Sequence, residues 1–179
     1  LRIVPALFGW EDPGAAFSAV IQIGTMLAIV VYFWRELTHV AFAWLRGLFD
    51  PSVRSTLEYR LGWYLVLATI PVAVFGFLFR HQIESGARNL WLIASTLIVM
   101  ALFLLWAERV GPRTRHEEDL NRRDAVVVGA AQSLALIPGV SRSGATITAG
   151  LFLGLTREAA ARFSFLLSIP AVVGSGLFE

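Results

Sequence analysis

The sequence has 179 residues, of which 56% are hydrophobic and only 16% are charged. Soluble globular domains carry roughly 45–50% apolar and about 25% charged residues, so the composition predicts a membrane protein. The small net charge of +2, without a long basic cluster, argues against a nucleic-acid-binding protein, and the lack of cysteine excludes disulfides and thiolate metal sites.

The chain starts and stops without the signals that mark a natural terminus. It opens with Leu1-Arg2-Ile3, and no charged segment, short apolar core and cleavage site of a secretory signal peptide follows. It stops equally abruptly at Phe178-Glu179. We therefore expect the sequence to be a fragment of a longer protein, truncated at both ends.

Three apolar stretches are long enough to cross a bilayer, which takes about 20 mostly apolar residues in a helix. They lie at about 13–34, 61–79 and 89–107, and none of them contains a charged residue. Tryptophans such as Trp34 and Trp106 lie near their ends, where aromatic belts form at the two membrane interfaces. The pattern predicts a polytopic, all-α membrane protein.

Another helix is expected between the first two spans, over residues 36–50. Its apolar residues, Val40 and Trp44 among them, fall on one helical face, which is typical of a helix lying on the bilayer surface. A helix packed against other spans would show the same pattern, so both interpretations stay open. The turn-forming sequence Asp50-Pro51-Ser52 ends this helix.

The segment 108–124 is the one strongly polar stretch, with five arginines and five acidic residues. Because these charges nearly cancel, we expect a solvated polar loop without a ligand. If the three spans alternate in direction, segments 35–57 and 108–124 share one side with eight arginines, against two in 80–88 on the other. The arginine excess places the eight-arginine side in the cytoplasm.

A re-entrant helix–loop–helix is expected at 125–155. Its two apolar halves are each too short to span the membrane, and Pro138-Gly139 and Gly144 lie between them. Irregular backbone at membrane depth is tolerated only where it is buried in protein or faces a watery cavity. A last span at about 157–178 follows, with Thr156 as its cap.

Arg142 lies between the two halves of this hairpin. A charge at membrane depth costs roughly 2.5–3.5 kcal/mol or more, and such residues usually mark the path of a substrate or ion. A guanidinium offers forked donors for phosphate oxygens, and flanking glycines let backbone N–H groups approach an anion. We expect the second short helix to begin near Ala145 or Thr146, with its anion-attracting N-terminus at the same place. The alternative is an arginine paired with an acidic residue of another helix.

The loop and its flanks therefore predict a phosphate-binding site. Gln132 either orients the ligand or hydrogen-bonds a neighbouring helix, and these two roles stay open. The three histidines lie scattered in polar loops without metal-ligand spacing. The candidate residues are Ser141, Arg142 and Ser143 for catalysis, and Gln132, Gly139, Gly144 and Thr146 for substrate binding.

The stretch from Gln132 to Thr146, Gln-Ser-Leu-Ala-Leu-Ile-Pro-Gly-Val-Ser-Arg-Ser-Gly-Ala-Thr, resembles the undecaprenyl-diphosphate phosphatase family, also called the bacitracin-resistance protein family. Its Pro-Gly-x-Ser-Arg-Ser-Gly-x-Thr motif is highly specific. Residues 154–170 and the N-terminal segments 1–10 and 22–24 resemble the same family, so the likeness covers essentially the whole chain.

The resemblance implies a multi-pass enzyme of the bacterial plasma (inner) membrane. It implies hydrolysis of undecaprenyl diphosphate to undecaprenyl phosphate, which recycles the lipid carrier of peptidoglycan synthesis and confers bacitracin resistance. The implied partners are the isoprenoid diphosphate lipid and the membrane, with no nucleic acid and with a homodimer as an open option. The implied cofactor is a divalent cation, magnesium or calcium.

The resemblance also implies an inverted repeat with two re-entrant hairpins, of which the similar segments 9–17 and 154–163 are a trace. The family's first hairpin, with its acidic residues, serine-rich turn and histidine, has no counterpart in this sequence. The cation ligands are therefore expected upstream of Leu1, and the fragment alone is expected to be inactive.

Two questions about mechanism stay open at the level of sequence. Ser141 and Ser143 are either nucleophiles or phosphate ligands, and we favour ligands because no base stands beside them. The alternative function is a transporter or flippase of isoprenoid phosphate lipids, because inverted repeats, broken helices and a midplane anion site also build transporters.

Overall fold

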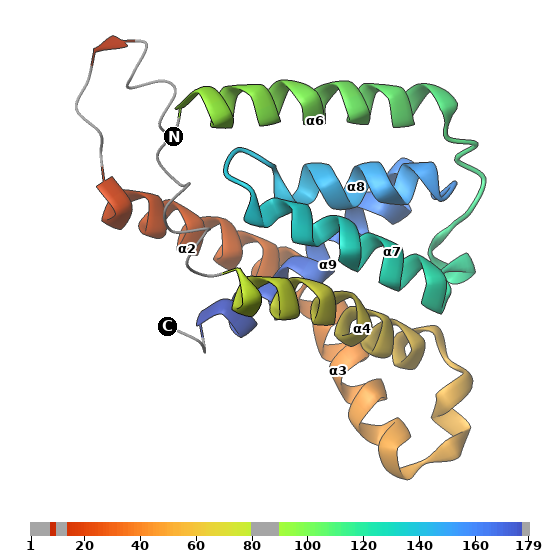
Figure 1. Cartoon of the computed structure of the whole chain (residues 1–179). Coiled ribbons are helices and arrows are strands. Elements are labelled where there is room, and N and C mark those ends of the chain that lie inside the picture. The colour runs from red at the N-terminus through yellow and green to blue at the C-terminus, as the bar shows by residue number, and fades with distance from the viewer. Residues whose placement is uncertain (1–7, 10–13, 80–89, 177–179) are drawn as a thin grey trace.

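The computed structural model describes residues 8–9, 14–79 and 90–176, and every regular element in this part of the chain is a helix (Figure 1). The predicted all-α fold class is therefore confirmed. Short 3-10 turns connect the helices at η1 (Pro51–Ser55), η2 (Glu117–Asp119) and η3 (Leu134–Leu136). The helices are α2 (Gly14–Tyr32), α3 (Trp34–Phe49), α4 (Leu57–Leu78), α6 (Leu90–Val110), α7 (Arg122–Ser133), α8 (Arg142–Phe152) and α9 (Arg157–Gly176).

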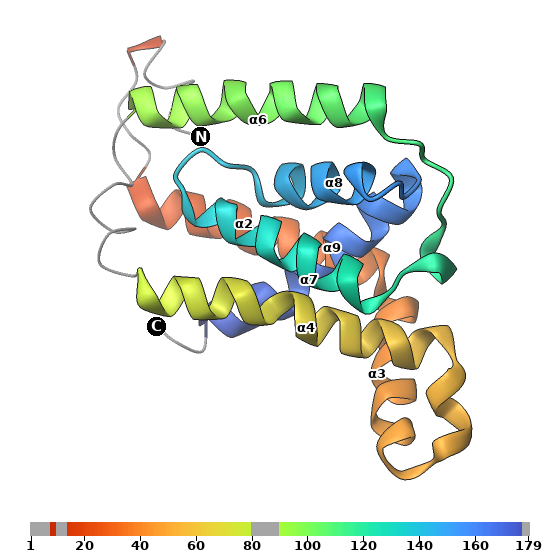
Figure 2. The same ribbon diagram turned by 45° about the vertical axis from the view of Figure 1, so that its right-hand side comes forward.

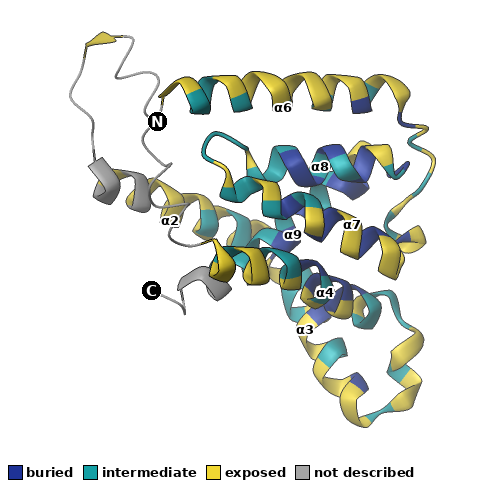
Figure 3. Ribbon diagram, viewed as in Figure 1, coloured by how far each residue is buried: buried dark blue, intermediate teal, exposed yellow. Residues whose placement is uncertain are grey.

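Helices α4 and α6 are each long and apolar enough to cross a membrane. Helices α2 and α3 meet the same criterion as a pair, although they are bent by 72° at the break between them. Helix α6 buries only Ala107 and turns a mostly exposed apolar surface outward (Figure 3). An apolar surface of this extent suits lipid better than water, in agreement with the predicted polytopic membrane protein.

Helices α7 and α8 form the helix–loop–helix expected at 125–155. They lie side by side with the loop at one end, and α6 runs alongside α8 (Figures 1 and 2). Helix α7 also packs on α4, and α8 packs on α9. The two helices have 12 and 11 residues, so neither could span a bilayer alone. The loop lies beside the first turns of α6, where Gly139 approaches Ile93 and Thr96.

Helix α3 packs closely along α4. A Cβ atom added at Gly47 would lie 2.4 Å from the Tyr59 ring, so the two helices approach each other through this glycine. The packing interpretation of residues 36–50 is confirmed for this face. On other faces of α3, Phe42 and Phe49 are 72% and 89% exposed.

The segment 108–124 is mostly exposed or half-buried, as expected for a solvated loop, but some of its residues depart from that expectation. Helix α6 continues to Val110, and Leu120 and Asp124 are fully buried. The Asp124 carboxylate accepts from the Arg115 guanidinium at 2.6 Å and from the backbone N–H of Asn121 at 3.0 Å. The hydrogen bond from Arg115 to this carboxylate raises the pKa of the Arg115 guanidinium. The prediction was wrong for this part because paired charges tolerate burial, and the composition of the segment does not reveal the pairing.

The start of α9 agrees with its predicted cap. The Thr156 hydroxyl accepts the backbone N–H of Ala159 at 3.2 Å, which satisfies a free donor in the first turn. The proposed likeness between residues 9–17 and 154–163 lies partly outside the described residues, because residues 10–13 are not among them. The inverted repeat therefore stays a prediction.

Candidate functional site

The loop of the hairpin ends earlier than predicted. Helix α8 begins at Arg142, with Ser141 as its N-cap, whereas the sequence placed the helix start near Ala145 or Thr146. The Ser141 hydroxyl accepts the backbone N–H of Gly144 at 3.1 Å. Serine is a favoured N-cap residue and helps a helix to begin at this position. The prediction treated Gly144 as a helix breaker and did not take this cap into account. Arg142 therefore lies in the first turn of a helix rather than in an irregular loop.

The N-terminus of α8 has free backbone donors. Ser141 uses its side chain to bind the N–H of Gly144, and its carbonyl accepts the N–H of Ala145 at 2.9 Å. The backbone N–H groups of Arg142 and Ser143 have no partner among the described residues. Free N–H groups at a helix start attract anions, and the positive end of the helix dipole adds to that attraction.

The loop is held against α6 by close contact at Gly139. This glycine has φ +93°, a left-handed conformation that side chains disfavour. A Cβ atom at this position would lie 2.2 Å from Thr96 Oγ1 and 2.6 Å from the Ile93 carbonyl oxygen. The Thr96 hydroxyl is 2.8 Å from the Pro138 carbonyl oxygen and can donate to it. Gly139 thus allows both the turn of the loop and the close packing of the loop against α6.

Thr96 is a positioning residue that the sequence did not reveal. It lies in a predicted span, where a threonine commonly hydrogen-bonds the backbone of its own helix. Its hydroxyl is also 2.8 Å from the Leu92 carbonyl oxygen, so that ordinary bond competes with the one to the loop. The only signal in the sequence is a polar residue within an apolar run, which does not say what it faces.

Thr146 and Gly144 contribute to the frame of the site. Thr146 is 1% exposed, and its hydroxyl lies 2.6 Å from that of Ser164 on α9 and 2.9 Å from the Arg142 carbonyl oxygen. A Cβ atom at Gly144 would meet the Ser141 side chain at 3.1 Å, so this glycine allows the cap to form. The geometry thus ties α8 to α9 at the turn that carries Arg142.

Arg142 opens onto a pocket of about 390 Å³ between α2, α8 and α9. The side chain is half-buried and has no hydrogen-bond or ion-pair partner among the described residues. The expected alternative, an arginine paired with an acid, is not seen in that part of the chain. Polar groups also line this pocket at Gln22, Ser143 and Ser164. An unpaired cation beside free N–H groups makes the pocket suited to an anion.

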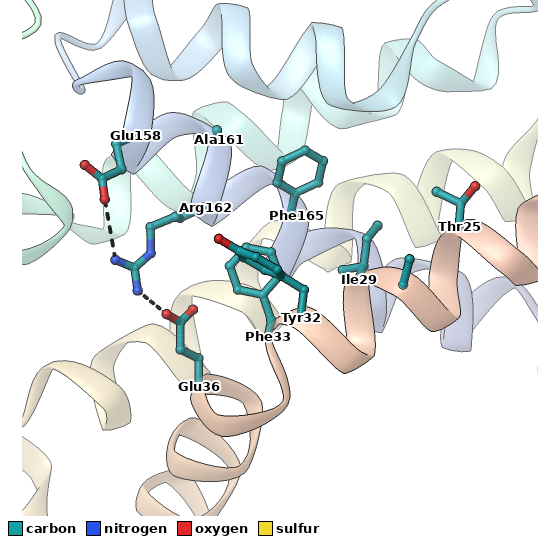
Figure 4. Close-up of a pocket in the computed structure, with 10 residues that line it drawn as sticks. Thr25, Ile29, Tyr32, Phe33, Glu36, Glu158, Ala161, Arg162 and Phe165 are labelled. Carbon is teal, nitrogen blue, oxygen red and sulfur yellow. Dashed lines mark hydrogen bonds and ion pairs between the residues drawn. The ribbon is translucent and has the colours of Figure 1, made fainter.

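A second pocket of about 640 Å³ continues along the same helices and shares Thr25, Ile29 and Phe165 with the first (Figure 4). At its far end Arg162 pairs with Glu36 and lies 3.9 Å from a Glu158 carboxylate oxygen.

Glu117 is also close to Arg162. It lies outside the helices that are long enough to span a membrane. Its carboxylate oxygen is 3.6 Å from the Arg162 guanidinium. Burial raises the pKa of Glu117, although the positive charge of Arg162 acts in the opposite direction. Arg162 is thus neutralised by carboxylates, whereas the charge of Arg142 is left for a ligand.

Gln132 is buried away from both pockets. Its side chain is 0% exposed, and neither its amide oxygen nor its amide nitrogen has a partner among the described residues. Gln132 does not line the pocket at Arg142. Its predicted role in substrate binding therefore stays a prediction, and the loop residues and Arg142 remain the stronger candidates.

The described residues do not form a metal site. Among them, no three His, Cys, Asp or Glu side chains come close enough together to hold a metal ion. No histidine or carboxylate is hydrogen-bonded to Ser141 or Ser143 in this part of the chain either, and the two hydroxyls lie 3.4 Å apart. The residues present therefore fit phosphate binding better than cation binding or serine nucleophile activation.

Comparison with known proteins gives one family over the full length of the chain. The model of the family described as bacitracin resistance protein BacA matches residues 1–179. Proteins named undecaprenyl-diphosphatase from Mycobacterium sp. (strain KMS) and Mycobacterium bovis (strain BCG / Pasteur 1173P2) are 56% and 55% identical to it over all 179 residues. A protein of the same name from Mycobacterium tuberculosis (strain ATCC 25618 / H37Rv) is 55% identical over the same residues. The chain covers 64%, 64% and 63% of these relatives' lengths, which is less than two thirds of each.

Proposed function

Because the chain belongs to the bacitracin resistance protein BacA family, we propose that it forms part of a membrane phosphatase that hydrolyses undecaprenyl diphosphate to undecaprenyl phosphate. The names of its relatives, at 56% and 55% identity, support this activity. The reaction would return the lipid carrier to peptidoglycan synthesis and so protect the cell from bacitracin. A bacterial plasma membrane is the corresponding location, and the helices α4 and α6, each long and apolar enough to span a bilayer, support a membrane location.

One observation carries the proposal, namely the guanidinium of Arg142 at the start of α8, which has no counter-ion within residues 8–9, 14–79 and 90–176. An arginine even half-buried in a membrane protein without a counter-ion is unfavourable unless a ligand supplies the negative charge. A diphosphate supplies it with several oxygens, and a guanidinium binds two of them at once. The free N–H groups of Arg142 and Ser143 point to the same anion.

The proposed chemistry is the hydrolysis of a phosphoric anhydride. A water oxygen forms a bond to the terminal phosphorus, while the bond from that phosphorus to the bridging oxygen breaks. The bridging oxygen leaves with undecaprenyl phosphate, and the terminal group leaves as inorganic phosphate with the oxygen from water. Negative charge grows on the bridging oxygen and on the terminal group, and Arg142 would stabilise it more in the transition state than in the ground state.

The two serines act as parts of the phosphate site in this proposal. The Ser141 hydroxyl caps α8 by accepting the backbone N–H of Gly144, and this hydrogen bond directs the hydroxyl toward the first turn of the helix. Ser143 lines the pocket together with Arg142, so its hydroxyl can donate to a phosphate oxygen. Neither is assigned as a nucleophile, because no base is bonded to either hydroxyl among the described residues.

The divalent cation, magnesium or calcium, stays a prediction that rests on the family resemblance. The described residues do not fit a metal ion, and the proposed hydrolysis uses only the groups of this chain and water. Removal of divalent cations by a chelator, followed by their separate return, would measure whether phosphate release depends on them.

The experiment that tests the proposal uses the intact protein in liposomes that contain undecaprenyl diphosphate. Release of inorganic phosphate, measured over time, is the expected result. Movement of the lipid between leaflets without any phosphate release would contradict the phosphatase and favour the transporter. Liposomes with protein inactivated by prior heating give the background rate.

A further inference from the structure

Gln22 is an amide in the middle of an apolar helix. The run 13–34 that forms α2 contains no charged residue, so an exposed glutamine within it is costly in a membrane unless it faces something polar. Polar residues in such helices usually face a cavity or a neighbouring helix rather than lipid.

Gln22 lies at the pocket of Arg142. Gln22 lines this pocket from α2, while Arg142 and Ser143 line it from α8. The pocket is open, so its polar groups can reach a ligand that enters between these helices. Helices α2 and α8, which are far apart in the sequence, thus both contribute polar residues to the lining of one pocket.

The hydrogen bonds of the other lining residues distinguish Gln22 from them. The Thr25 hydroxyl donates to the Ile21 carbonyl at 3.0 Å, and the Ser168 hydroxyl donates to the Phe165 carbonyl at 2.6 Å. These two groups are satisfied within their own helices.

Ser164 is likewise engaged, because its hydroxyl bonds that of Thr146 at 2.6 Å. The amide of Gln22, like the guanidinium of Arg142, has no partner among the described residues. Apart from the Ser143 hydroxyl, which lies 3.4 Å from that of Ser141, the polar side chains left without a partner in the described part of the pocket lining are the charged Arg142 on α8 and the neutral Gln22 on α2.

We infer that Gln22 donates its amide N–H to an oxygen of the same diphosphate that Arg142 binds, so that the headgroup is held from both sides of the pocket. This inference rests on the proposed function. A neutral amide suits the second contact, because it has two N–H donors and adds no further charge at membrane depth. A carboxylate of the same shape would repel the diphosphate instead.

The test uses the intact protein with Gln22→Met and Gln22→Glu, and Ile23→Met as the matched control on the same helix. Ile23 is 59% exposed and does not line the pocket. Two quantities are measured for each variant: KM and kcat for phosphate release from undecaprenyl diphosphate, and the affinity for an isoprenoid methylenediphosphonate that cannot be hydrolysed.

Loss of one hydrogen bond to a charged group corresponds to roughly a tenfold to hundredfold loss of affinity, so we expect that change for Gln22→Met. Gln22→Glu should lose more than Gln22→Met, and part of its loss should return at lower pH, where the new carboxyl is protonated. Ile23→Met should behave as the wild type. A packing role alone would not produce this pH-dependent difference between the two variants.

Two results would overturn the inference. The first is that both Gln22 variants bind the diphosphonate with an affinity within twofold of that of the wild type. The second is that both variants lose affinity equally at every pH. If the wild type binds the diphosphonate but releases no phosphate, only the proposed phosphatase activity is contradicted. The affinity measurements on the Gln22 variants still test the role of Gln22 in that case.

Discussion

Replacement of Gly139 by alanine tests whether the loop is fixed against α6. The new Cβ atom would lie 2.2 Å from Thr96 Oγ1, 2.6 Å from the Ile93 carbonyl oxygen and 2.7 Å from the Ile93 Cα. A side chain at positive φ costs about 1–2 kcal/mol, and an extra methyl group in a packed contact costs about 1–3 kcal/mol more. We therefore expect Gly139→Ala to lower the free energy of unfolding by roughly 2–5 kcal/mol.

The same variant should displace the turn that carries Arg142. A misplacement of about 1 Å at a reacting group can reduce the rate by about a hundredfold. Thermal unfolding in detergent and phosphate release from undecaprenyl diphosphate measure the two effects. Adding Thr96→Ala should not rescue the variant, because the backbone contacts with Ile93 remain.

A matched glycine variant provides the control. Gly76→Ala places its Cβ 3.8 Å from a Leu136 methyl group, an ordinary contact inside helix α4, so stability and rate should stay close to those of the wild type. If Gly139→Ala unfolds at the wild-type temperature and releases phosphate within twofold of the wild-type rate, the loop is not held against α6 as described.

Thr96→Val should lower kcat more than Thr96→Ser, because only serine keeps the hydroxyl that bonds the Pro138 carbonyl oxygen, and equal rates would contradict this. Asp124→Ala should destabilise the protein by about 1–3 kcal/mol in thermal unfolding, because it removes the buried carboxylate that accepts from Arg115 and from the Asn121 backbone N–H, and an unchanged melting temperature would refute that. Burial raises the pKa of Glu117 and so lets the folded state bind the proton more tightly than the unfolded chain. Stability should therefore fall as pH rises through that raised pKa, and Glu117→Gln should flatten the profile there; an unchanged profile would contradict the assignment.

The sequence predicted the helical membrane fold and the hairpin because both depend on local properties. Long uncharged runs and breaks at Pro138-Gly139 can be read from neighbouring residues. The start of α8 was misplaced because the cap at Ser141 depends on one side-chain bond, to the N–H of Gly144. A serine three residues before a glycine is equally compatible with a loop and with a helix cap, and only the backbone conformation decides between them.

The parts that the sequence could not predict depend on contacts between distant segments. Thr96 meets Pro138 across 42 positions, and the Gln22 amide shares a pocket with a residue 120 positions away at Arg142. The burial of Asp124 depends on its pairing with Arg115, which charge counts over 108–124 do not reveal. The sequence shows which polar residues lie within apolar runs, but it does not show which residues they contact.

The central claim is that Arg142 binds the diphosphate, and phosphate release by Arg142→Ala and Arg142→Lys in the intact protein tests it most directly. Loss of one transition-state donor lowers kcat by about a hundredfold to a thousandfold, which is the result expected for Arg142→Ala. Arg142→Lys should recover little, because an ammonium group cannot replace the forked donors of a guanidinium. Arg46→Ala, at an arginine with a 72% exposed side chain on α3, serves as the control and should keep the wild-type rate. Near-normal turnover by Arg142→Ala would contradict the account.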